Sequence, residues 1–85
     1  MRLPIIKHAL SFINENDADY IEECIAVLEH LTESSNIKDM EIDVIGELLS
    51  NLYGAIEVNE AIINGSNQKD ALNEFMERVK GSINL

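Results

Sequence analysis

The chain has 85 residues, including 16 acidic and 6 basic ones, which gives a formal net charge of −10. The length fits one domain, and a hydrophobic fraction of 46% is typical of a globular protein rather than a disordered one. The negative charge disfavours binding to nucleic acid through a basic face and binding to anionic membrane surfaces.

The first residues do not read as a signal peptide, because Lys7 and His8 interrupt the apolar positions and no small-residue cleavage site follows. No segment approaches the ~18 apolar residues of a membrane span. Cys24 is the only cysteine, which excludes a disulfide within the chain and fits a reducing cytosol. We therefore expect a cytoplasmic protein with no membrane contact.

The first half of the chain predicts two helices. Pro4 suits the start of a helix over residues 4–14, because its missing N–H has no helical partner there. Asp17 can cap a second helix over residues 18–32. The apolar stripe of this second helix has three- and four-residue spacing and consists of Ala18, Ile21, Cys24, Ile25, Leu28 and Leu31.

The second half predicts one long and one short helix. Helical periodicity runs over residues 39–64, with Asn36 or Asp39 as the cap, and Gly65 suits the left-handed position after the helix end. A fourth helix begins at Ser66 or Asn67, and Gly81 is expected to stop it.

Sustained period-two alternation is absent, so the prediction is all-α: one domain over residues 1–85, folded as a compact four-helix bundle with a long central third helix. That helix would be ~39 Å long at 1.5 Å per residue. Three shorter helices are not expected to cover its wide apolar face, so we also predict a homodimer.

Small residues recur every fourth position in the third helix, at Gly46, Ser50 and Gly54, and the track continues through Val58 and Ile62. An interior glycine costs about 0.8–1 kcal/mol relative to alanine, so two in one helix need a reason. Small residues at this spacing admit another helix closely. The packing logic leaves open whether a helix of the same chain or a second copy fills this groove.

No metal or cofactor site is expected. Neither His8 nor His30 has a glutamate three residues before it, as a di-metal helical bundle would need. Asp39, Glu41 and Asp43 have the spacing of a calcium loop, but Val44 occupies the position where that loop needs glycine. No arrangement of serine, histidine and acid predicts a catalytic residue either.

Cys24 lies in the stripe of the second helix beside Ile21 and Leu28, so it is interpreted as a small buried hydrophobic residue. A redox thiol is the alternative interpretation, although no CxxC pair supports it.

Three segments resemble a family of short uncharacterised bacterial proteins: residues 1–8 (MRLPIIKH), residues 41–58 (EIDVIGELLSNLYGAIEV) and residues 71–83 with ALN at the start and GSI at the end. The resemblance covers the whole chain. It implies a cytoplasmic domain of unknown function, in gene neighbourhoods that include peroxiredoxins and thioredoxin-like proteins. It carries over no functional residue.

These observations predict a small acidic protein-interaction module, an adaptor or regulator with itself and an unidentified protein as partners, rather than an enzyme. The alternative is an accessory protein of thioredoxin- or peroxiredoxin-linked thiol and peroxide metabolism.

Overall fold

A computed structural model describes residues 1–83, with side chains described for residues 1–80. It contains four helices: α1 (Leu3–Glu15), α2 (Ala18–Leu31), α3 (Asp39–Ile63) and α4 (Gln68–Ile83). No strand occurs within residues 1–83. The all-α prediction is confirmed, and α3 is the longest helix as expected.

Local capping chemistry sets several helix ends. The Asp17 side chain accepts a hydrogen bond from the Asp19 N–H at 2.9 Å, as predicted for the start of α2. Gly65 follows α3 with a φ of 116°, a left-handed conformation that glycine adopts without strain. At the start of α4, Asn67 Oδ1 accepts from the Asp70 N–H at 2.8 Å.

Two predicted helix ends were wrong. Neither Asn36 nor Asp39 caps α3; Lys38 holds the cap position, and its N–H donates to the Glu41 carboxylate at 3.0 Å. Helix α4 does not stop at Gly81 but continues to Ile83. Glycine weakens a helix interior by about 1 kcal/mol without forbidding it, so it does not by itself end a helix.

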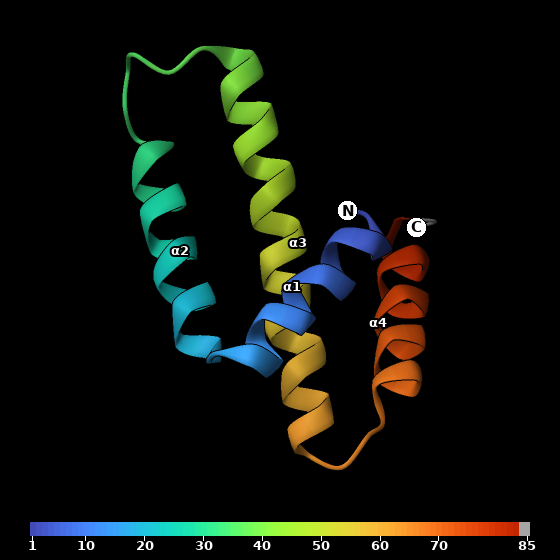
Figure 1. Ribbon diagram of the computed structural model, residues 1–85. Coiled ribbons are helices and arrows are strands. Elements are labelled where there is room, and N and C mark those ends of the chain that lie inside the picture. The colour runs from blue at the N-terminus through green and yellow to red at the C-terminus, as the bar shows by residue number, and fades with distance from the viewer. Residues whose placement is uncertain (84–85) are drawn as a thin grey trace.

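Helix α3 is the centre of the molecule and contacts the other three helices. In Figure 1, α2 runs beside it on one side, α4 lies on the other, and α1 crosses in front. The result is a flat, bundle-like arrangement with extents of 43 × 35 × 18 Å.

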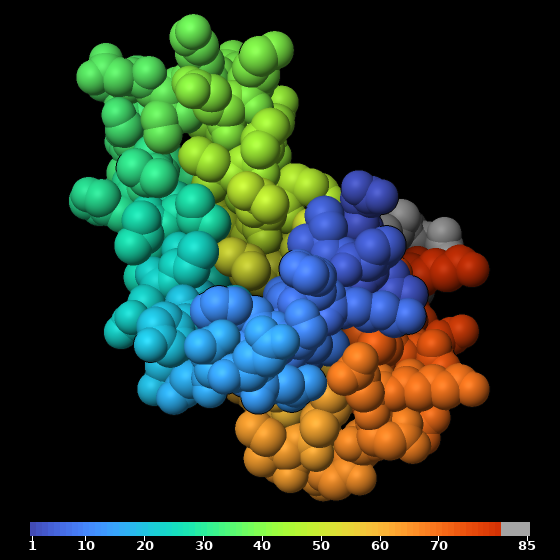
Figure 2. All heavy atoms as spheres, in the orientation of Figure 1, coloured from blue at the N-terminus to red at the C-terminus, as the bar shows by residue number. Residues whose placement is uncertain are grey.

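The hydrophobic core gathers around the C-terminal half of α3. Each helix contributes to it, and its buried members are Ile6, Leu10, Ile13, Ile21, Ile25, Ala55, Val58, Ala71, Leu72 and Phe75. The buried core residues of α3, Ala55 and Val58, are therefore in its second half. The first half projects beyond α1 and α4 with α2 alone beside it, as Figures 1 and 2 show.

Candidate functional site

The predicted groove residues of α3 do not share one environment. A Cβ built on Gly54 would lie 2.9 Å from Phe75 Cζ of α4 and 3.2 Å from Ile6 Cδ1 of α1. Val58 is likewise buried, whereas Ser50 and Ile62 are half-buried. Two helices of the same chain therefore approach α3 closely at Gly54.

Gly46 lies at the opposite extreme. It is exposed, and a Cβ built on it would meet nothing within 4 Å. The reason is geometric: at 3.6 residues per turn, each four-residue step advances about 40° beyond a full turn. Over the sixteen residues from Gly46 to Ile62 the track winds by roughly 160°, so it cannot form one straight groove.

Asn51 is a buried polar residue that the sequence did not single out. Its side chain is 0% exposed. Its Oδ1 accepts from the Arg2 N–H at 2.7 Å, and its Nδ2 donates to the Glu47 carbonyl at 2.9 Å. Asn51 therefore fixes the start of α1 against α3. A polar residue within the apolar stretch from Leu48 to Ile56 was the available signal.

The start of the chain makes a second contact with α3. The Met1 amino group forms an ion pair with the Glu47 carboxylate. This hydrogen bond and the positive charge hold the pKa of Glu47 below its usual value. Together with Asn51, the contact orients α1 across the middle of α3.

Several exposed apolar side chains lie on the arm, which we define as residues 17–48: α2, the following loop and the first part of α3. Most of its large exposed apolar side chains form one row on each helix, while Ile42, 36% exposed, lies on the other side of α3. We call the two rows together the arm face: Tyr20, Cys24, Val27 and Leu31 on α2, and Met40, Val44 and Leu48 on α3. Met40 is 73% exposed, and Val27 and Val44 are each 60% exposed.

Both rows lie on the side of the arm where α1 packs. Val44 and Leu48 precede the buried residues Asn51 and Ala55 by seven residues, about two helical turns, and so share their face of α3. On α2, the Tyr20 ring meets Phe12 of α1 edge-on, with centroids 5.8 Å apart. The arm face is thus the uncovered continuation of the surface of α2 and α3 against which α1 packs.

A hollow of about 530 Å³ lies where α1 meets α2 and α3. It is lined by His8 and by apolar residues of three helices, including Phe12 of α1, Ile21 of α2 and Leu52 of α3. Apolar surface is therefore accessible at the junction of α1 with the arm as well as along the arm itself.

On the opposite side of α3 a hydrogen bond joins this helix to α2. Tyr53 lies about 180° around α3 from Val44, and its hydroxyl donates a hydrogen bond to the Glu29 carboxylate of α2. That hydrogen bond, together with desolvation and the carboxylate charge, raises the pKa of Tyr53. This contact ties α2 to α3 on the side away from α1.

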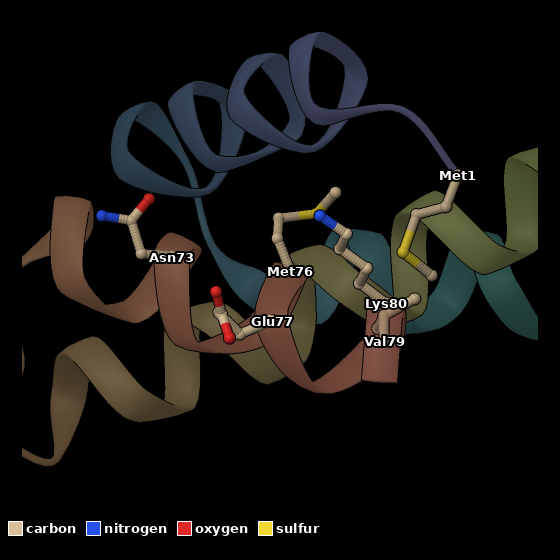
Figure 3. Close-up of a pocket in the computed structure, with 6 residues that line it drawn as sticks. All are labelled: Met1, Asn73, Met76, Glu77, Val79 and Lys80. Atoms are coloured by element: carbon tan, nitrogen blue, oxygen red, sulfur yellow. The ribbon is translucent and has the colours of Figure 1, made fainter. Parts of the chain in front are cut away.

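A second hollow, of about 670 Å³, lies between the start of the chain and α4. Figure 3 shows Met1 at one end and α4 residues along the rest: Asn73, Met76, Glu77, Val79 and Lys80. Three of the six are apolar, and the polar three are of different kinds. They do not form the nucleophile, base and orienting group that a catalytic site needs.

Cys24 is exposed, so its interpretation as a buried residue was wrong. It lies in the stripe of α2, but the buried members Ile21 and Ile25 face α3 while Cys24 lies on the flank with Tyr20. His8 and His30 are both exposed, and His30 Nδ1 lies 3.2 Å from the Glu33 carboxylate. These residues are not brought together.

Within the described part of the chain, no three histidine, cysteine or acidic side chains are grouped so that they could hold a metal ion. Among the same residues, no helix has the length and apolarity needed to cross a membrane.

Comparison with curated proteins and with solved structures finds no match to this chain. A family model does match, and it covers residues 1–84. The chain belongs to the family of unknown function DUF6952.

Proposed function

We propose that this chain is a small, acidic, cytoplasmic protein-interaction module, an adaptor or regulator that acts by surface contact rather than by catalysis. The observation that carries the proposal is the arm face, where seven residues in two rows are exposed. Contiguous apolar surface on a soluble domain marks protein-interaction sites more often than isolated apolar residues do.

Site-specific photo-crosslinking in cells of the source organism tests this proposal. A photoreactive benzoylphenylalanine at Val44 should give a covalent adduct of defined mass. The matched control is the same group at Ile63, which is 73% exposed at the far end of α3 and outside the arm. Adducts at Val44 that do not exceed those at Ile63 would count against the interaction module.

Self-association as a homodimer is part of the proposal. The open side of α3 at Gly46, about 200° around the helix from Val44, is the surface available for a second copy. Small residues there allow close approach of another helix. Because both copies are acidic, the dimer should strengthen as salt rises and screens the repulsion.

Light scattering across protein and salt concentrations measures this directly. The expected mass is twice the 9.5 kDa of one chain, and Gly46→Leu should return it to one chain. A single-chain mass at every protein and salt concentration would remove the homodimer from the proposal.

A second candidate is an accessory role in thioredoxin- or peroxiredoxin-linked thiol metabolism, supported by the exposure of Cys24. It predicts a mixed disulfide, trapped in cells by acidifying and alkylating the lysate, that disappears in Cys24→Ser. If the wild-type chain yields no such disulfide under peroxide stress, this candidate fails.

A further inference from the structure

The charge of the molecule is concentrated on the arm. Residues 17–48 hold ten acidic residues and one lysine, and thus −9 of the formal net charge of −10. All ten carboxylates are on exposed residues. The arm face is therefore an apolar surface within a strongly negative region. A partner that covers it needs apolar side chains for the two rows and positive charge for the carboxylates.

We infer that the arm face binds a cationic amphipathic helix of a partner protein, with apolar side chains on the two rows and basic side chains toward the surrounding carboxylates. The inference rests on the proposed interaction function and names its partner class. Laying an amphipathic helix on an apolar surface is a common recognition mode, and complementary charge accelerates association and rejects wrong partners.

The fold already contains one example of this packing. Helix α1 lies on the same side of α2 and α3, and residues 1–16 hold two basic residues and one acidic residue. Residues 1–16, which include α1, therefore pack against α3 with a net positive charge from their side chains. A partner helix on the arm face would continue the packing of α1 toward the loop between α2 and α3, where Figure 2 shows no part of α1 or α4.

The dimensions fit one short helix. From Tyr20 to Leu31 the row on α2 extends ~16 Å, and from Met40 to Leu48 the row on α3 extends ~12 Å, at 1.5 Å per residue. A helix of about three turns covers that length. A second copy using the same face would bring only one lysine of its arm to these carboxylates, whereas a cationic helix complements their charge.

The test uses a labelled synthetic peptide of about four turns, with leucines along one face and lysines elsewhere, and measures its binding by fluorescence anisotropy. One control peptide has the same composition with the leucine row scrambled. The other carries glutamate in place of lysine. The patterned lysine peptide should bind at least about tenfold more tightly than the scrambled one, and the glutamate peptide should not bind.

Substitutions in the protein locate the contact. Val44→Ser combined with Leu48→Ser should weaken binding of the patterned peptide by about tenfold or more, while Ile63→Ser, a change at a more exposed apolar residue outside the arm, should leave it unchanged. Circular dichroism confirms that each variant is folded. These substitutions remove no buried side chain, so the fold should persist.

Each of four results would overturn the inference. Equal binding of the scrambled peptide would mean that charge alone attracts it. Equal loss in Ile63→Ser would place the contact elsewhere. If the wild-type chain forms a dimer and the double variant Val44→Ser, Leu48→Ser is a monomer, a second copy covers the arm face. If the patterned peptide fails to bind while Val44 still crosslinks in cells, the interaction function stands and only the cationic partner class is wrong.

Discussion

The side chain of Asn51, buried in the middle of α3, accepts a hydrogen bond at 2.7 Å from the backbone N–H of Arg2, the N-cap residue of α1. The Arg2 side chain makes no capping hydrogen bond to α1. The orientation of α1 across α3 therefore depends on a residue about fifty positions further along the chain.

Asn51→Ala should destabilise the fold by about 1–3 kcal/mol, because it leaves the Arg2 N–H without its acceptor and removes a buried side chain. Urea denaturation followed by circular dichroism measures the change. Asn73→Ala is the matched control at an exposed position of α4 and should be neutral or slightly stabilising, since alanine is the better helix former. Equal effects of the two substitutions would contradict the role of Asn51.

The two interior glycines of α3 should respond in opposite directions to the same substitution. At concentrations where the chain is monomeric, Gly46→Ala should stabilise the protein by about 0.8–1 kcal/mol, because the added methyl group has open space in the single chain and alanine favours the helix. Gly54→Ala should destabilise it, since overpacking against Phe75 and Ile6 costs about 1–3 kcal/mol and exceeds the helix gain. Thermal denaturation of the two variants gives the comparison. If both substitutions raise the melting temperature, the close packing at Gly54 is not rigid.

Tyr53 should ionise above the usual tyrosine range while Glu29 is its acceptor. Ultraviolet absorption of the Tyr20→Phe variant isolates Tyr53, since the chain has two tyrosines and no tryptophan. Adding Glu29→Gln should lower the pKa of Tyr53, because both the charge and the strongest acceptor are lost. The raised pKa stabilises the fold below about pH 10, and this contribution is lost as pH rises from there through the folded-state pKa. An unchanged titration in Glu29→Gln would show that the hydrogen bond has no influence.

Cys24 should react with a neutral alkylating reagent in the native protein at nearly the rate seen in urea, because it is exposed. Iodoacetamide is preferable to an anionic disulfide reagent, which the acidic arm would repel. Mass spectrometry over time follows the labelling. Modification that requires denaturant would mean that another surface, such as a second copy, covers α2.

Much of the secondary structure could be predicted from the sequence, because the signals at several helix ends are local. Asp17, Asn67 and Gly65 act through neighbouring backbone groups, and the apolar periodicity between them fixes the helical state. Two ends were predicted wrongly. Lys38, at the start of α3, is not a strongly preferred cap residue, and Gly81 is a weak helix breaker that does not end α4.

The surface that matters was decided by tertiary packing. Gly46 and Gly54 look alike in the sequence, yet one is open and the other lies against Phe75 and Ile6. Cys24 shares a stripe with Ile21 and Ile25 but stays exposed. Periodicity tells which residues lie on one helix face. Whether that face is covered depends on where the other helices end and cross, and here α1 and α4 leave the first half of α3 beside α2 alone.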